Sequence, residues 1–161
     1  MTARLRQEIE ERHAAEQRLR EREELYRYTV ELSRQFVWTA GPDGIIVPVS
    51  PLFGELTGLR ETETGDEWLS TIHPDDRPGL LAQWMEIVAR REPGSAEFRL
   101  RMADGSYRFH RAQAAPRFDE EGEVVRWYGF TEDVHEQRLA ETARERAEER
   151  YRLAARATND A

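Results

Sequence analysis

The distribution of glycine, proline and tryptophan constrains this fold more than any other feature of the sequence. All 10 glycines, all 7 prolines and all 4 tryptophans lie between Arg34 and Val134. Glycine and proline interrupt helices and mark turns, whereas both ends of the chain are rich in Glu and Arg and show helical spacing. The sequence therefore predicts a central domain at residues 34–134 between a linker helix at residues 1–33 and a second helix at residues 135–161.

The N-terminal segment carries a sparse apolar seam. Its members recur at alternating steps of four and three residues, which is typical of a coiled-coil face: Leu5, Ile9, Leu19, Tyr26 and Val30. Charged residues occupy the remaining seam positions. The pattern favours a dimeric coiled coil, and a single solvated helix is the alternative.

Five runs separated by turn sequences predict strands: residues 36–40, 45–50, 96–102, 107–118 and 124–130. Ser50-Pro51 predicts an N-cap followed by a first-turn proline, and residues 80–88 predict a longer helix. This order predicts an α+β fold, a five-stranded antiparallel sheet with short helices on one face, flanked by coiled-coil-like helices.

The last predicted strand is apolar on both faces. Strand alternation groups Val125 with Trp127, and Val124 with Tyr128 and Phe130. A sheet face that the domain's own helices leave uncovered needs a partner. We therefore predict a parallel homodimer through the N-terminal helix and the sheet.

Composition excludes several classes of function. The net charge of -8 argues against nucleic-acid binding, and the absence of cysteine excludes disulfides, thiol nucleophiles and cysteine-ligated metals. No apolar run approaches the ~20 residues that span a bilayer, and no signal-peptide pattern follows Met1. We expect a cytoplasmic, non-enzymatic segment without membrane contact, without catalytic residues and without metal ligands.

Several motifs together resemble a PAS domain with its C-terminal (PAC) half: FVWTAGPDGIIVPVSPLFGELTGL, IHPDDRPGLLAQW, EFRLRMADGSYRF and VVRWYGFTEDVHEQR. The resemblance covers roughly Gln35 to Arg138. It implies a sensory and dimerisation module of a bacterial signalling protein, in a two-component system or a similar pathway. Such a module relays conformational signals to a downstream histidine kinase or diguanylate cyclase.

A short internal match supports tandem domains. EELYR at residues 23–27 and EERYR at residues 148–152 are 125 residues apart. A repeat of this size predicts that a second PAS domain begins where the sequence ends. Chance agreement between two Glu- and Arg-rich helices is the alternative.

The junction between the last strand and the C-terminal helix is the predicted signalling site. In the PAS family this strand ends in an Asp-hydrophobic-Thr motif, and Asp133, Val134 and His135 take that place, with His where Thr is usual. The carboxylate can cap the helix, favour its positive end or pair with a cation near the core. An ordinary N-cap is the alternative for Asp133. For His135 we expect a solvated helix start, although histidine can titrate near neutral pH.

Seven apolar residues predict either a filled core or the lining of a ligand cavity: Phe36, Trp38, Phe53, Leu56, Trp68, Trp84 and Phe98. Arg111 and Gln113 would meet a polar ligand if they face inward. The longer helix lacks the haem-ligating His of the family, and cysteine-dependent flavin photochemistry lacks its cysteine. We expect no cofactor of either kind. A receptor for another small or flavin-like molecule and a passive dimerising spacer are the alternatives to the relay.

The remaining histidines suggest structural roles. His73, Asp75 and Asp76 form a candidate metal or acid–base cluster, but His-Pro-Asp-Asp more simply makes a turn and caps the following helix. His110 is predicted to be a surface or sheet-packing residue.

Overall fold

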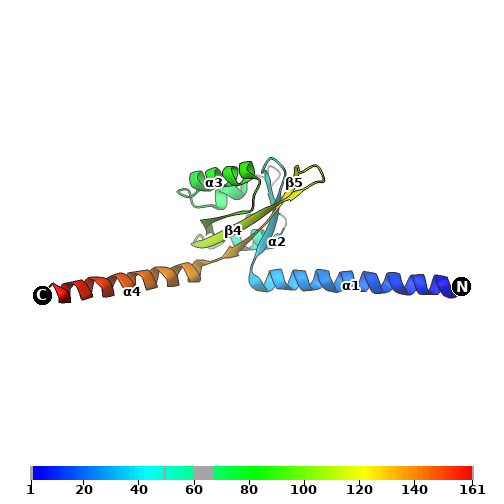
Figure 1. Ribbon diagram of the computed structural model, residues 1–161, viewed down its shortest axis with the longest axis horizontal. Coiled ribbons are helices and arrows are strands. Elements are labelled where there is room, and N and C mark those ends of the chain that lie inside the picture. The colour runs from blue at the N-terminus through cyan, green and yellow to red at the C-terminus, as the bar shows by residue number, and fades with distance from the viewer. Residues whose placement is uncertain (1, 49, 60–66, 161) are drawn as a thin grey trace. The chain divides into compact units, whose positions relative to one another are not determined.

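The computed structural model describes residues 2–48, 50–59 and 67–160. Residues 1 and 161, the outer ends of the two predicted helical segments, lie outside the described residues. The chain forms two compact units, Met1–Gln35 and Phe36–Ala161, which are drawn in Figure 1.

The first unit consists of one helix, α1, at Ala3–Ser33. The Thr2 hydroxyl accepts a hydrogen bond from the backbone N–H of Leu5 and caps the first turn. The helix ends at Arg34, which adopts the left-handed conformation with φ 53°. No residue of α1 is buried, and the seam residues Leu5, Leu19 and Tyr26 are exposed.

The second unit contains one antiparallel sheet in the order β2-β1-β5-β4-β3. Its strands are β1 (Phe36–Ala40), β2 (Ile46–Pro48), β3 (Gly94–Arg101), β4 (Tyr107–Phe118) and β5 (Val124–Asp133). The predicted α+β fold with a five-stranded antiparallel sheet and helices at both ends is thereby confirmed.

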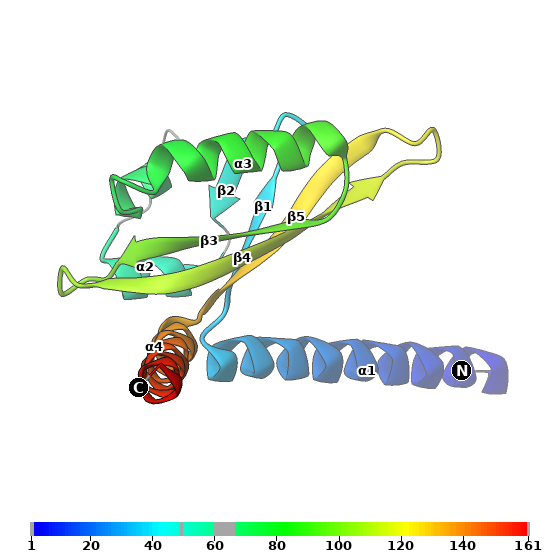
Figure 2. The ribbon, with the colours of Figure 1, turned by 60° about the vertical axis from the view of Figure 1, so that its left-hand side comes forward.

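Three helical elements pack on one face of this sheet: α2 (Pro51–Thr57), the 3-10 helix η1 (Glu67–Thr71) and α3 (Arg77–Arg90), as Figure 2 shows for α2 and α3. The Ser50 hydroxyl accepts from the Leu52 N–H, so the predicted N-cap of α2 forms. The η1 helix was not predicted, because a 3-10 helix of five residues is too short to show a hydrophobic period.

Three tryptophans form the centre of the core. Trp84 of α3 makes edge-to-face contacts with Trp38 and Trp127, with ring centroids 5.4 and 5.3 Å apart. The Trp127 side chain is fully buried. Gly129 pairs with Trp38 across the β1–β5 ladder, and a Cβ at this glycine would lie 2.2 Å from the indole ring. The sheet therefore admits the Trp38 ring only because position 129 has no side chain.

A bulge changes the faces of β5 near its start. The β4–β5 register shifts between Arg117 and Phe118, so that Phe118 pairs with Val124 and Val125 has no paired residue. Val124 consequently packs against the core, whereas Tyr128 remains exposed on the outer face. Grouping Val124 with Tyr128 by simple alternation was wrong for this reason.

Candidate functional site

The sheet continues into the C-terminal helix through a single residue. Strand β5 ends at Asp133, and α4 spans His135–Asn159. Val134 between them is buried, and its N–H donates to the Phe109 carbonyl over 2.9 Å. This bond extends the strand pairing to the first residue outside the helix. The helix is therefore joined to the sheet without a loop.

The Asp133 carboxylate joins β4, β5 and α4. One oxygen accepts from Arg108 Nε over 2.6 Å, and the other accepts from the His135 backbone N–H over 2.9 Å. Arg108 also pairs with Glu136 in the first turn of α4. Burial raises the pKa of Asp133, but the hydrogen bonds from Arg108 and His135 outweigh it and hold the pKa below its usual value. Asp133 thus both caps the helix and pairs with a cation.

The His135 ring packs on the sheet. It lies nearly parallel to the Phe109 ring, with centroids 5.8 Å apart, and its Nδ1 accepts the Phe109 backbone N–H over 3.1 Å. The side chain is half-buried. The expected solvated helix start was wrong here, because β4 runs beside the junction and supplies both the ring and the donor.

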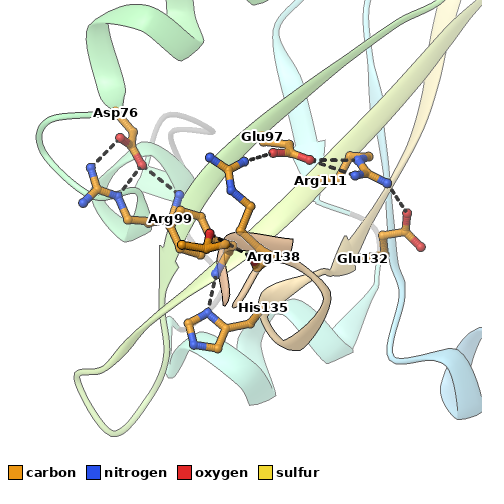
Figure 3. A network of polar contacts seen from close by, with 9 residues as sticks. Asp76, Glu97, Arg99, Arg111, Glu132, His135 and Arg138 are labelled. Atoms are coloured by element: carbon orange, nitrogen blue, oxygen red, sulfur yellow. Dashed lines mark hydrogen bonds and ion pairs between the residues drawn. The ribbon is translucent and has the colours of Figure 1, made fainter. Parts of the chain in front are cut away.

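A second set of ion pairs holds the first turn of α4 to the outer sheet face. Arg138 pairs with Glu97 of β3, and its guanidinium lies 5.0 Å from the centre of the Phe109 ring. Glu97 also pairs with Arg111 of β4, which contacts Glu132 of β5. Figure 3 shows this network crossing three strands to reach the helix. Sequence reasoning missed Arg108, Glu97 and Arg138, since the pairing of charged residues across strands depends on register.

A cavity of about 80 Å³ lies between the sheet and the helices. Six of the predicted residues line it: Phe36, Trp38, Phe53, Trp68, Trp84 and Phe98. Leu56 packs against the core but does not belong to the lining.

Arg111 and Gln113 do not face the cavity. Strand alternation places Ala112 and Ala114 of β4 in its wall, so their neighbours point to the outer face. The polar side chains in the described lining are those of Ser95 and Thr131, and neither is charged. The Thr131 hydroxyl accepts from the Trp38 indole N–H over 3.1 Å. A polar ligand would therefore find few partners in this cavity.

The His73, Asp75 and Asp76 cluster differs from the expected helix cap. The Asp76 carboxylate makes no capping bond to α3. It accepts from the Arg99 backbone N–H over 2.8 Å and from the Arg99 guanidinium over 2.7 and 3.0 Å. The turn itself is present, with the Asp75 N–H donating to His73 Nδ1. Asp76 faces β3 because the following helix packs over that strand.

His110 lies in the core, fully buried. Its ring stacks near Phe98, and Nδ1 lies 3.0 Å from the Arg108 carbonyl. Burial lowers the pKa of His110, so the ring is neutral at pH 7.

Two features that the described residues lack bear on possible functions. Within the described ranges, no group of three or more His, Cys, Asp or Glu side chains could hold a metal ion. None of the helices in the described part of the chain has the length and apolar character that crossing a membrane requires.

Comparisons with known families and curated proteins identify one matching family and two relatives. The PAS fold family matches residues 46–131. A Sinorhizobium fredii protein with the name Uncharacterized protein y4lL is 36% identical over 149 residues, which are 92% of this chain and 18% of that protein. The peroxide stress-activated histidine kinase mak1 of Schizosaccharomyces pombe is 37% identical over 84 residues, 52% of this chain and 5% of the kinase. The chain thus spans less than a fifth of either relative.

Solved structures show the same fold. A sensory box histidine kinase/response regulator from Burkholderia thailandensis aligns with a TM-score of 0.61 and 25% identity, over 80% of this chain and 98% of that one. The N-terminal domain of a diguanylate cyclase with PAS/PAC sensor from Marinobacter aquaeolei aligns with a TM-score of 0.57 and 20% identity, over 65% and 98% of the two chains.

Proposed function

This chain belongs to the PAS fold family, and we propose that it is a non-enzymatic relay and dimerisation module of a cytoplasmic signalling protein. In this proposal, α4 transmits a movement of the sheet to a histidine kinase or diguanylate cyclase output domain. The observation that carries it is the loop-free junction, where Asp133 binds Arg108 of β4 and the His135 backbone at once. The assignment to a sensory class is taken from the similar solved structures. The relay is inferred from the geometry of the junction.

The geometry supports transmission for a mechanical reason. Contacts from β3, β4 and β5 converge on the first turn of α4: Glu97 with Arg138, Arg108 with Glu136, and Asp133 with the His135 N–H. A shift of one strand against another must stretch at least one of these contacts. The helix then changes its orientation or loses a contact, and a bias between two such states is the form that a relayed signal takes.

Substitution of Asp133 by alanine tests the relay. The change removes a capping and pairing carboxylate without deleting core volume, so we expect a stability loss of about 1 kcal/mol and a folded domain. Hydrogen exchange across residues 134–147 should become faster, and output activity of the longer protein should change at constant pH. Unchanged exchange together with unchanged output would contradict the relay and leave the passive spacer.

The proposed homodimer has two candidate surfaces. The outer sheet face exposes Tyr128 at 48%, and the α1 seam exposes Leu19 at 56%. Apolar surface of this kind favours association of matching faces in a two-fold dimer. Sedimentation equilibrium at tens of micromolar should give the mass of a dimer. A monomer at that concentration would contradict the proposal.

The cavity supports a second candidate function, reception of a small molecule. Its volume of about 80 Å³ and its apolar lining favour a compact, uncharged, largely apolar molecule over a charged or extended one. Native mass spectrometry and an absorption spectrum of the purified protein test this candidate. A bound small molecule in stoichiometric amount would support the receptor, and its absence after screening with small apolar compounds would favour the relay without ligand.

A further inference from the structure

We propose that His135 is a pH-dependent latch, which holds the first turn of α4 on β4 when neutral and releases it when protonated. Its consequence for signalling rests on the proposed relay, whereas the latch itself is a local property of the junction. The contacts that define it are the ring stacking on Phe109 and the hydrogen bond from the Phe109 N–H to Nδ1.

The hydrogen bond requires one protonation state of the ring. Nδ1 of His135 accepts the Phe109 N–H over 3.1 Å, so Nδ1 carries no proton, and a neutral ring carries its proton on Nε2. A protonated imidazole has an N–H at both nitrogens. Nδ1–H would then point at the Phe109 N–H, and two donors would face each other. Contacts on both sides hold the backbone donor in place: the Arg108 carbonyl, in the same peptide plane as the Phe109 N–H, lies 3.0 Å from His110 Nδ1, and the following Phe109 carbonyl accepts from Val134.

Charged and titratable side chains from three elements surround the junction. They are Arg108 and His110 of β4, Asp133 of β5, and Glu136 and Arg138 of α4. Glu97 of β3 is connected to these groups through its ion pair with Arg138.

The surroundings lower the pKa of three of these groups. Hydrogen bonding from Arg108 holds the pKa of Glu136 below its usual value, and the pKa of Asp133 is also lowered on balance. Burial lowers the pKa of His110, which favours its neutral form. Among these groups, the docked geometry depends directly on the protonation state of the His135 ring, because its Nδ1 accepts the Phe109 N–H and its ring stacks on Phe109.

The direction of the pH response follows from the role of His135 Nδ1 as a hydrogen-bond acceptor. The docked state binds the neutral ring, so protonation favours the released state, and docking weakens as the pH falls.

Nuclear magnetic resonance on the whole 161-residue chain tests the latch. At pH 7.5, long-range proton–nitrogen spectra should show the His135 tautomer with its proton on Nε2. As the pH falls to 5.5, the chemical shift of the Phe109 amide and the chemical shifts of the His135 ring should change with the same midpoint pH. After correction for intrinsic exchange, protection of the Phe109 amide should fall about threefold to tenfold, the factor that a net hydrogen bond contributes.

A matched variant separates the latch from other pH effects. In His135→Asn the side-chain oxygen occupies the place of Nδ1 and can accept the same N–H, but the amide does not titrate. Protection of Phe109 should therefore become independent of pH between 5.5 and 7.5. His73→Asn, which removes a histidine from another part of the domain, should keep the wild-type response.

Three outcomes would overturn the latch: a His135 ring with its proton on Nδ1 at pH 7.5, a Phe109 amide that ignores the His135 titration, or an Asn variant with the wild-type pH dependence. These readouts involve no output domain. A failed latch therefore leaves the Asp133 test of the relay, performed at constant pH, unaffected.

Discussion

Single residues at close contacts determine how this core packs. Gly129 faces the Trp38 ring, and Thr131, two residues further along β5, accepts the indole N–H of the same tryptophan. One residue provides space for the ring and the other satisfies its polar atom. Position 129 is thereby restricted to glycine for a packing reason, since its backbone conformation is not left-handed.

Gly129→Ala should destabilise the second unit strongly. A Cβ would lie 2.2 Å from the Trp38 ring, which forces the ring or the strand to move, and overpacking of this kind costs about 1–3 kcal/mol. The measurement is the free energy of unfolding by urea. Gly79→Ala is the matched control, because no atom lies within 4 Å of its new Cβ and alanine favours the helix. Equal stability of the two variants would contradict the packing argument.

Asp76 should contribute to the stability of the folded state, and this contribution should decrease at acidic pH. The hydrogen bonds from Arg99 lower the pKa of Asp76 below its usual value. A carboxyl with a lowered pKa stabilises the folded state above its ordinary pKa, and this contribution disappears as the pH falls through the lowered value. Asp76→Asn should therefore lose about 1 kcal/mol at pH 7, after allowance for solvent screening, and progressively less as the pH falls through the lowered pKa of Asp76.

The control for this prediction is Asp75→Asn. Its carboxylate is 80% exposed and lies 3.9 Å from His73, so we expect little change at either pH. Urea unfolding of both variants at several pH values gives the comparison. A difference between Asp76→Asn and wild type that does not shrink as the pH is lowered would contradict the charge-based origin.

At the scale of elements, the junction between β5 and α4 differs from an ordinary strand–helix connection. One buried residue, Val134, separates the two elements, and its N–H continues the strand pairing. The helix is otherwise exposed beyond its first turns, with no buried residue. Its orientation is therefore determined by the contacts of a few residues at its start.

Arg138→Gln should loosen this start without unfolding the domain. The change removes the pair with Glu97 and the cation over the Phe109 ring, both on the outer sheet face. We expect faster hydrogen exchange in residues 135–142 and a melting temperature within about 2 °C of wild type, since an exposed ion pair contributes little to global stability. Arg144→Gln, one to two turns along the same helix, is the control. Identical exchange in the two variants would show that Glu97 does not anchor α4.

At the scale of the whole molecule, the sheet has one face covered by its own helices and one face that is partly open. The inner face holds the tryptophan cluster and the cavity. The outer face mixes the ion pairs around Arg111 with apolar side chains such as Tyr128 and Phe130. If two copies associate through this face, the partner would lie near the junction and could change the contacts that orient α4.

Tyr128→Glu should weaken the proposed dimer. A carboxylate placed in the apolar part of the outer face must be desolvated when two copies associate. We expect the dimer dissociation constant to rise at least about tenfold, with the far-ultraviolet spectrum unchanged. Glu120→Gln in the turn before β5 provides the control. Unaltered self-association in Tyr128→Glu would exclude this part of the sheet from the interface.

The sequence alone determined the strands, the α-helices and their order, because those depend on local patterns, whereas the short η1 was not predicted. Turn residues separated the strands, alternation identified β3, and the Gly- and Pro-free ends predicted both long helices, all of which are present. The aromatic residues of the cavity followed from their apolar character, and Asp133 was recognised by its place in a motif.

Tertiary structure decided which side chains meet. Strand alignment brings Arg108 within reach of Asp133 and places Glu97 opposite Arg111. A bulge moves Val124 to the core, and the approach of β4 gives His135 its donor. Each of these depends on distances between segments far apart in the sequence. Periodicity records only which face of an element a residue occupies, so the partners of a charged or polar side chain appear only when the strands are aligned.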